Sequence, residues 1–206
     1  MKVVLATGNP HKVEEISRAL PADIELVPQS AFDVEPAIED GLSFVENAII
    51  KARHAARATG LPAIADDSGL EVDALDGAPG IYSARFAGQD ATDADNNSKL
   101  LAALNGLPAA QRTARFQCVI AMLRHAADPT PLIAFGTFDG LILDAPRGDH
   151  GFGYDPLFLV PALDRSVAEL TPAQKDEISH RARALLSLQA QLSERLAASR
   201  DNSPER

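Results

Sequence analysis

Short apolar segments alternate along the chain with segments whose apolar residues recur at helical spacing. A near-continuous apolar run at residues 2–6 predicts a strand that is covered on both faces. After the following turn, Val13, Ile16 and Leu20 predict a helix that begins directly after this strand. Residues 24–27 predict a second strand. Strands that alternate with helices are typical of a layered α/β fold.

A second helix and a third strand are predicted next. Between residues 42 and 58 the apolar residues form one stripe, and the charged residues, Lys51 among them, mostly face away from it. Residues 63–65 predict a short buried strand that ends in Asp-Asp-Ser-Gly at residues 66–69. Open α/β sheets bind ligands at the carboxyl ends of their strands, so this position favours a site.

The middle of the chain predicts a hairpin. Residues 115–122 and 132–143 are apolar, β-branched segments joined by a turn-rich loop. Gly136 and Gly140 predict a bulge or bend in the second arm.

The C-terminal part predicts a last strand at residues 156–160 and a final helix from about residue 179 to residue 196. Residues 199–206 are polar and are predicted to form a mobile tail. Because no linker rich in glycine and serine divides the chain, we expect one folding unit with a cleft.

Composition narrows the classes of function. The 206 residues include 19 Lys and Arg against 29 Asp and Glu, and the net charge of −10 argues against binding to duplex nucleic acid. No apolar run reaches the roughly 20 residues that span a bilayer, and the N-terminal apolar stretch is too short for a secretory signal. The single cysteine, Cys118, excludes an internal disulfide and fits a reducing compartment, so we expect a cytoplasmic protein without membrane partners.

A turn between the first strand and the first helix is a candidate phosphate site at residues 7–12. Such a turn presents backbone N–H groups and the positive end of a helix dipole. Thr7 and Asn9 add side-chain hydrogen bonds, and Lys12 adds a mobile positive charge. The alternative is an ordinary turn in which Asn9 caps the helix.

Two acidic segments could bind a hard cation. Adjacent residues of an extended chain point to opposite sides, so one of Asp66 and Asp67 can face a ligand while the other supports the turn. A carboxylate there could hold Mg²⁺, orient a water molecule, or do both. Glu39, before the second helix, could supply a second ligand; the alternative is that it only complements the helix dipole.

Two further segments could bind a flat, polar ligand. Glycines on either side of Phe152 let the backbone approach such a ligand while the ring stacks on it. Ser179 fits a helix N-cap, which places His180 and Arg181 in the first turn of the final helix. Cations are mildly unfavourable there, so an anionic or carbonyl-bearing ligand would explain them. The alternatives are a hydrophobic turn and a solvated basic cluster.

Six motifs occur in one order along the chain, and together they resemble a known family. They are Thr7-Gly-Asn-x-x-Lys12, Phe44-Val-Glu-Asn47-Ala48 with Lys51-Ala52, Ala65-Asp-Asp-Ser-Gly69, Gly77-Ala-Pro-Gly-Ile-Tyr-Ser-Ala-Arg85, Phe152-Gly-Tyr-Asp-Pro156 and Ser179-His-Arg181. This ordered set resembles the noncanonical purine nucleoside triphosphate pyrophosphatases, the inosine/xanthosine triphosphatase family. The resemblance implies an α/β fold with an elongated central mixed sheet flanked by helices. It also implies a single domain at residues 1–198, with two lobes and a nucleotide-binding cleft between them, and a homodimer.

The resemblance also implies roles for individual residues. Asp67 would be the catalytic carboxylate that activates water and would also contact Mg²⁺. Glu39 would be the second metal ligand, although Glu35 or Asp40 could substitute for it. The residues implied to bind the triphosphate are Thr7, Gly8, Asn9, Pro10, His11 and Lys12. Those implied to bind the nucleotide and its base are Ser68, Phe152, Gly153, Tyr154, Asp155, Lys175, His180 and Arg181.

The implied reaction is hydrolysis of ITP, dITP and XTP between the α- and β-phosphates, which gives the monophosphate and pyrophosphate. Lys175, His180 and Arg181 could donate to the carbonyl at purine position 6, where adenine instead presents a donor. Two points stay open: how guanine is excluded, and whether Asp67 takes a proton or positions a hydroxide held by the cation. The alternatives are a nucleotide sensor that does not cleave and a Maf-like pyrophosphatase that acts on other modified nucleotides.

One position departs from the pattern of this family, which commonly has a further glycine where this chain has His150. If the backbone at that position needs a positive φ, we expect the histidine to be strained. The shape of the loop that follows would then change.

Overall fold

The computed structural model describes residues 1–21 and 23–201. The chain divides into two compact units. Unit 1 comprises residues 1–67, 119–136 and 183–206, and unit 2 comprises residues 68–118 and 137–182. The part of the expected mobile tail from residue 202 onward lies outside the described residues.

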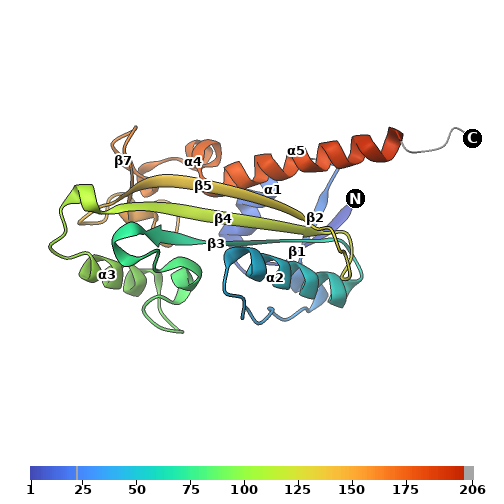
Figure 1. The fold of residues 1–206 in the computed structure, drawn as a ribbon, viewed down its shortest axis with the longest axis horizontal. Coiled ribbons are helices and arrows are strands. Elements are labelled where there is room, and N and C mark those ends of the chain that lie inside the picture. Colours follow the sequence, from blue (N-terminus) through green and yellow to red (C-terminus); the bar gives the residue numbers. More distant parts are fainter. Residues whose placement is uncertain (22, 202–206) are drawn as a thin grey trace, which may run out of the picture. The chain divides into compact units, whose positions relative to one another are not determined.

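Within the described residues, a seven-stranded sheet has the strand order β2-β1-β3-β4-β5-β6-β7 (Figure 1). The strands are β1 (Lys2–Leu5), β2 (Glu25–Pro28), β3 (Ala63–Val72), β4 (Thr113–Leu123), β5 (Leu132–Ile142), β6 (Phe158–Val160) and β7 (Arg165–Ser166). β1 pairs in parallel with β2 and β3, whereas β6 pairs antiparallel with β5 and β7. The prediction of an α/β fold with a mixed sheet is therefore confirmed.

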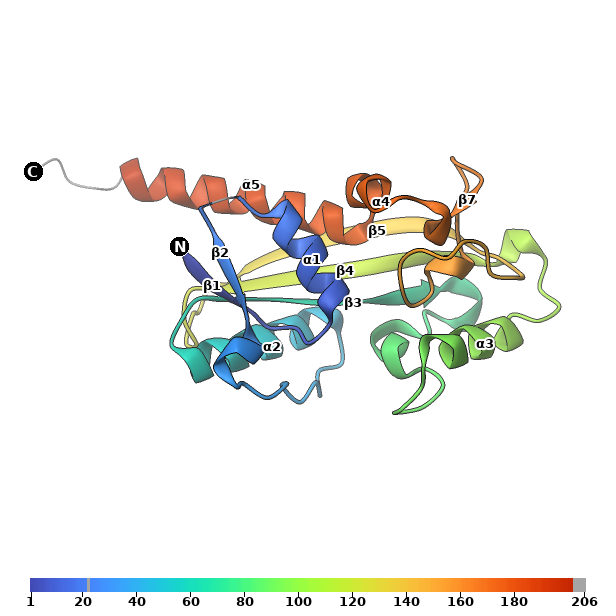
Figure 2. The ribbon, with the colours of Figure 1, turned by 180° about the vertical axis from the view of Figure 1, so that it is seen from behind.

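Helices flank this sheet. They are α1 (Pro10–Ala19), α2 (Phe44–Thr59), α3 (Asp93–Ala103), α4 (Pro172–Ile178) and α5 (His180–Asp201). In unit 1, α2 lies on one face of the strands, and α1 lies on the other with the unit 1 part of α5 (Figures 1 and 2). None of the helices in the described part of the chain has both the length and the hydropathy needed to span a bilayer.

The sequence did not predict β7, α3 or α4. α3 buries Asn96 and Leu100 and otherwise shows mostly polar residues, so it has no apolar stripe from which to read a period. α4 has only 7 residues and β7 only 2, and segments this short show no recognisable spacing of apolar residues.

The prediction that β3 ends at residue 65 is wrong, because the strand continues through Asp66 and Asp67 to Val72. Both aspartates are buried, with 1% and 7% of their surface exposed. β1 pairs with β3 only as far as Leu5, opposite Ile64. The acidic motif therefore lies within β3, but just past the carboxyl end of the neighbouring parallel strand β1.

The final helix also extends further than expected. α5 runs to Asp201, so the first residues of the expected tail are helical. The prediction of its start is confirmed, since the hydroxyl oxygen of Ser179 accepts a hydrogen bond from the backbone N–H of Ala182 at 3.2 Å, as an N-cap does.

Each unit has its own core. In unit 1, small side chains of α2 pack against the strands; they are Ala48, Ala52, Ala55 and Ala56. In unit 2, Phe158 is fully buried against Phe116 and Phe138, at ring centroid distances of 4.5 and 5.5 Å. A Cβ on Gly140 would lie 2.4 Å from the Phe158 ring and from a β6 carbonyl oxygen. This glycine lets β6 approach closely.

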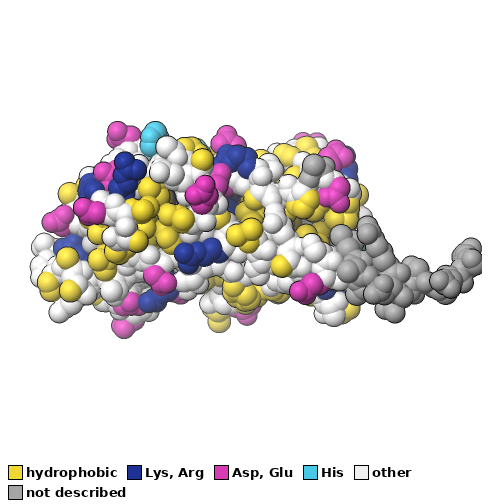
Figure 3. All heavy atoms as spheres, turned by 90° about the horizontal axis from the view of Figure 1, so that it is seen from above, with side chains coloured by type: hydrophobic (Ala, Val, Ile, Leu, Met, Phe, Trp, Pro, Cys, Tyr) yellow, Lys and Arg dark blue, Asp and Glu magenta, His cyan; other side chains and the backbone are white. Residues whose placement is uncertain are grey.

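On the face shown in Figure 3, basic side chains are interspersed with acidic ones. The charge of −10 is therefore not concentrated in one patch of this face.

Candidate active site

The turn after β1 caps α1 through Asn9. The Asn9 carboxamide oxygen accepts hydrogen bonds from the backbone N–H groups of His11 and Lys12, at 2.9 and 3.4 Å. Pro10 occupies the first helical turn, and the Thr7 hydroxyl oxygen accepts from the N–H of Asn9 at 3.2 Å. The capping alternative is therefore present, and it uses N–H groups that a phosphate would otherwise need.

Lys12 is held by Asp66. Its ammonium lies 2.9 Å from the carboxylate of Asp66, whose side chain is fully buried, while 15% of the Lys12 side chain is exposed. The ion pair joins the first turn of α1 to β3. Lys12 is thus a positioned charge beside the turn rather than a freely solvated one.

The neighbouring Asp67 pairs with a different helix. The ammonium of Lys51, on α2, lies 2.8 Å from the Asp67 carboxylate and 3.1 Å from the Glu39 carboxylate. One cation therefore brings together the two acidic residues that the sequence proposes as metal ligands. Among the described contacts, none joins the side chains of Glu35 or Asp40 to this group; the backbone carbonyl of Glu35 contacts His54.

The pKa values of Asp67 and Lys51 are both raised, for different reasons. Burial raises the pKa of Asp67, and Lys51 only partly offsets the effect. Burial alone would lower the pKa of Lys51, but the carboxylates of Asp67, Asp66 and Glu39 outweigh it and raise that pKa. The buried Oδ2 of Asp67 has no hydrogen-bond partner within the described structure.

Lys51 was predicted to lie on the outward face of its helix, which is wrong, and its contacts with Glu39 and Asp67 were not predicted. Only 13% of its side chain is exposed. The signal was its spacing: Lys51 follows the buried Ala48 by three residues, which puts both on one helix face. Asp66, Asp67, Glu39, Lys12 and Lys51 are referred to below as the acidic cluster.

In unit 2, the segment at residues 151–155 forms a tight loop. Gly151 and Gly153 have φ values of 78° and 62°, which favour glycine. The Asp155 carboxylate accepts hydrogen bonds from the backbone N–H of Phe152 at 3.1 Å and from the Lys175 ammonium at 2.7 Å. A Cβ on Gly151 would lie 2.1 Å from that carboxylate, so a side chain there is also excluded by space.

Cationic and aromatic side chains gather around this loop. The Lys175 ammonium lies 4.5 Å from the centre of the Phe152 ring, within cation–π range. His180 stacks on Phe116, with ring centres 4.8 Å apart. Arg181 is buried and donates to the Ser68 hydroxyl at 3.0 Å. Unit 2 thus joins Phe152, Asp155 and Lys175, and separately joins Ser68 to Arg181.

Tyr154 has a different environment from Phe152. Its buried hydroxyl donates to the backbone carbonyl of Ser83 at 2.8 Å. Burial, with a contribution from Asp93, raises the pKa of Tyr154 above its ordinary value. The hydroxyl is therefore a neutral donor that anchors the loop.

The condition for strain at His150, a positive φ, is not met. Among the described residues other than glycine, positive φ values occur at Asp33, Asp76 and Asp164. The left-handed conformations in this stretch fall on glycines, so His150 keeps an ordinary backbone and donates its N–H to the Ala168 carbonyl at 3.0 Å.

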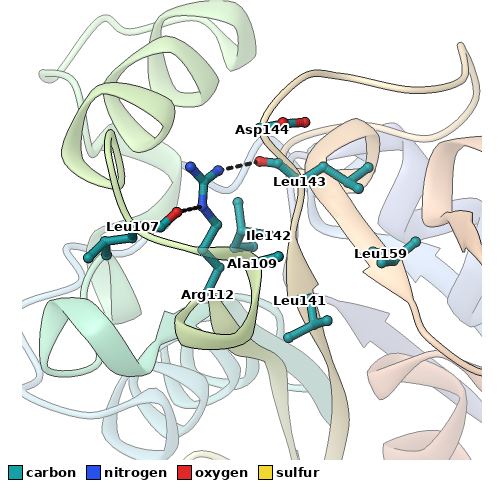
Figure 4. Close-up of a pocket in the computed structure, with 8 residues that line it drawn as sticks. All are labelled: Leu107, Ala109, Arg112, Leu141, Ile142, Leu143, Asp144 and Leu159. Carbon is teal, nitrogen blue, oxygen red and sulfur yellow. Dashed lines mark hydrogen bonds between the residues drawn. The ribbon is translucent and has the colours of Figure 1, made fainter.

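A cavity of about 170 Å³ in unit 2 contains none of the predicted site residues (Figure 4). Its lining residues are Leu107, Ala109, Arg112, Leu141, Ile142, Leu143, Asp144 and Leu159. The Arg112 guanidinium donates to the backbone carbonyls of Leu104, Leu107 and Leu143. These bonds hold together three segments of unit 2, which gives this arginine a structural role.

The fold is that of an α/β protein, with a cluster of charged side chains in unit 1 and a group of aromatic and cationic side chains in unit 2. Residues 3–191 match the Ham1 family, so the chain belongs to that family, and the resemblance drawn from the six motifs is confirmed.

Curated relatives agree with this assignment. The chain is 57% identical to a dITP/XTP pyrophosphatase of Vibrio parahaemolyticus, over 95% of this chain and 98% of the relative. It is 59% identical to a dITP/XTP pyrophosphatase of Yersinia pseudotuberculosis, over 89% and 94% of the two chains.

Solved structures are similar as well. A HAM1 protein from Coxiella burnetii matches with a TM-score of 0.88 and 50% identity, over 94% of this chain and 99% of that one. The Ham1 protein of Staphylococcus aureus matches with a TM-score of 0.85 and 42% identity, over 95% and 100% of the two chains.

Proposed function

We propose that this protein hydrolyses noncanonical purine nucleoside triphosphates, namely ITP, dITP and XTP, to the monophosphate and pyrophosphate. Membership of the Ham1 family and the names of the relatives at 57–59% identity support the reaction. The observation that carries it is the acidic cluster, in which one Lys51 ammonium contacts both Glu39 and Asp67 while the Oδ2 atom of Asp67 keeps its acceptor capacity among the described residues.

The triphosphate binds at the turn of residues 7–12. The ammonium of Lys12, held by Asp66, and that of Lys51 supply positive charge. Because Asn9 already caps α1, the charge of these two lysines carries more of the phosphate binding than free backbone N–H groups do.

Glu39 and Asp67 would hold a Mg²⁺ ion. Carboxylate oxygens are the ligands that Mg²⁺ takes from proteins, usually one or two of them. The Lys51 ammonium lies between Oδ1 of Asp67 and Oε2 of Glu39, and this shared position fits such an ion. When bound, Mg²⁺ would offset the negative charge of the phosphates.

Asp67 acts on the attacking water. It orients the water and accepts its proton at Oδ2 as the water oxygen bonds to the α-phosphorus. The bond from that phosphorus to the bridging oxygen breaks, and pyrophosphate leaves with the electron pair. In the metal-free protein burial raises the pKa of Asp67, and a cation bound at its other oxygen would lower that pKa.

The base is recognised in unit 2. Phe152 stacks on the purine, and Lys175, His180 and Arg181 supply donors for the carbonyl at position 6. Asp155 holds the Lys175 ammonium above the Phe152 ring. Adenine would face these donors with a donor of its own, and a mismatch of this kind discriminates strongly.

We also propose a homodimer in the cytoplasm. The dimer rests on the family resemblance, and light scattering of the purified protein would test it. The location rests on the single cysteine, which fits a reducing compartment.

A substrate panel tests the proposal. ITP, dITP, XTP, dGTP, ATP and modified pyrimidine triphosphates are assayed with and without Mg²⁺, and with and without added inorganic pyrophosphatase. We expect phosphate from the three proposed substrates only when both Mg²⁺ and the auxiliary enzyme are present. Tight binding without any product would indicate a sensor, and a preference for modified pyrimidines would indicate a Maf-like enzyme.

Two separate lysine substitutions test how the purine base is recognised. We expect Lys175→Met to reduce the preference for ITP over ATP by roughly 10²-fold, because a buried donor is lost. Lys99→Met is the matched control, since the Lys99 ammonium also lies 4.5 Å from a phenylalanine ring, that of Phe86. Equal effects of both variants on the preference would remove Lys175 from base recognition; thermal unfolding checks that each variant is folded.

A further inference from the structure

Two side chains of α3 hold both backbone polar groups of Gly153. The Asp93 carboxylate accepts a hydrogen bond from the Gly153 N–H at 2.6 Å, and the Asn97 amide donates to the Gly153 carbonyl at 2.9 Å. Residues four apart lie one above the other on a helix, so both side chains reach the loop from one face of α3.

The backbone of Gly153 adopts a conformation that these two hydrogen bonds help to fix. Its φ of 62° lies in the left-handed region, and a Cβ there would meet no atom within 4 Å. Conformation rather than space therefore calls for glycine, and glycine is the residue with the most conformational freedom to lose.

The neighbours of Gly153 already have anchors of their own. The N–H of Phe152 is bonded to Asp155, and the hydroxyl of Tyr154 is bonded to Ser83. The peptide groups of Gly153 lie between these anchors. Their attachment to α3 completes the fixation of the loop that carries the Phe152 ring.

We propose that Asp93 and Asn97 are positioning residues that hold the Phe152 ring in place for stacking on the purine. This inference rests on the proposed function, because the ring matters only if a base binds there. The two residues contact the loop and not the substrate, so they act on nucleotide binding more than on the chemical step.

The start of α3 does not depend on Asp93. Thr92 and Asp95 form a capping box: the Thr92 N–H donates to the Asp95 carboxylate at 2.9 Å, and the Asp95 N–H donates to the Thr92 hydroxyl at 3.2 Å. Replacing Asp93 therefore leaves the helix start intact.

Steady-state kinetics with ITP test the proposal. We expect Asp93→Ala and Asn97→Ala each to raise KM roughly tenfold and to change kcat less than about twofold, since each variant loses one hydrogen bond to the loop. Asp93→Asn keeps an acceptor oxygen and should recover most of the affinity. Ser98→Ala is the control on the same helix, because the Ser98 hydroxyl bonds to the Ala94 carbonyl of α3 itself.

Hydrogen exchange of the Gly153 amide, measured without nucleotide, gives a readout that does not depend on activity. We expect faster exchange in Asp93→Ala at an unchanged Tm, and the wild-type rate in Ser98→Ala. If the wild-type protein hydrolysed no nucleotide of the panel, the proposed function would be overturned. The exchange rates alone would then test whether Asp93 and Asn97 restrain Gly153. Wild-type activity with unchanged KM and unchanged exchange in both alanine variants would overturn the positioning role, as would a loss of kcat at constant KM.

Discussion

Two buried aspartates of unit 1 differ in how their carboxylates are satisfied. Asp128, in the loop between β4 and β5, accepts hydrogen bonds from the backbone N–H and the guanidinium of Arg124 and from the backbone N–H of Thr130, at 2.5 to 3.0 Å. Asp67 accepts from Lys51 alone among the described donors. The bonds from Arg124 lower the pKa of Asp128 far below its ordinary range, whereas burial raises the pKa of Asp67.

This difference is what we expect between a structural carboxylate and a functional one. A carboxylate whose lone pairs are all used, such as that of Asp128, stabilises the loop that surrounds it and has nothing left for a ligand. A buried carboxylate with an unused oxygen, such as that of Asp67, costs stability, and a bound ligand can recover that cost. Stability and activity should therefore respond in opposite ways when each residue is changed.

The largest effect is expected from Asp67→Asn. An amide of the same shape removes the base and one carboxylate ligand, so kcat for ITP hydrolysis should fall by roughly 10³-fold. Its Tm should equal or exceed that of the wild-type protein, because a buried charge is removed. Steady-state kinetics and thermal unfolding measure the two quantities.

Asp139→Asn is the control for this variant, because 76% of the Asp139 side chain is exposed. It should keep wild-type kcat. Full turnover by Asp67→Asn would remove Asp67 from the mechanism and, with it, the distinction between the two aspartates.

Glu39→Gln should have a smaller effect. The Glu39 side chain is 34% exposed against 10% for Asp67, so water can replace part of what its carboxylate supplies. We expect the Mg²⁺ concentration for half-maximal activity to rise roughly tenfold, with kcat recovered at high Mg²⁺. A titration of activity against Mg²⁺ measures this, and an unchanged midpoint would shift the role of second ligand to another residue.

The spacing of apolar residues predicted most strands of the sheet, but it did not predict that Asp66 and Asp67 lie inside β3. Residues 2–6 and the hairpin arms were recognised because apolar residues dominate them. Asp66 and Asp67 looked like the end of a strand, since two adjacent charges inside a sheet are costly. Their ion partners, Lys12 and Lys51, come from two helices that are distant in the sequence, and no local pattern shows that pairing.

The candidate site divides in the same way. Asp67 was proposed from the motif at residues 65–69, and Glu39 and Lys175 were proposed from the family resemblance, because residue type and order carry that information. The contacts of Gly153 with Asp93 and Asn97 did not follow, because α3 has no apolar stripe and was not predicted at all. Contacts between polar residues that are distant in the sequence could be identified only once the fold was known.

Asp128→Asn tests the other half of the comparison. It weakens several charge-assisted hydrogen bonds within the loop, so Tm should fall by about 5 °C while kcat for ITP stays within about twofold. Thermal unfolding gives the shift, and assays well below Tm give the activity. A loss of activity without a loss of stability would contradict the structural role.

The pH dependence of stability should have opposite signs at the two aspartates. The folded-state pKa of Asp128 is lowered below its ordinary value of 3.8, so its contribution is present above that value and is lost as the pH falls below it. The Tm gap between the wild-type protein and Asp128→Asn should therefore stay constant above about pH 4 and narrow steadily as the pH falls below that value.

The folded-state pKa of Asp67 is raised above 3.8. The stability of the wild-type protein should therefore decrease as the pH rises from 3.8 through the raised value. Lys51 stays protonated throughout, because its own pKa is raised from 10.5. Asp67→Asn should therefore gain a few degrees of Tm relative to the wild-type protein between about pH 3 and pH 7, measured without Mg²⁺. If the Tm differences of the two variants from the wild-type protein changed in the same way with pH, both carboxylates would be equally satisfied by hydrogen bonds. That result would contradict the proposed difference between Asp128 and Asp67.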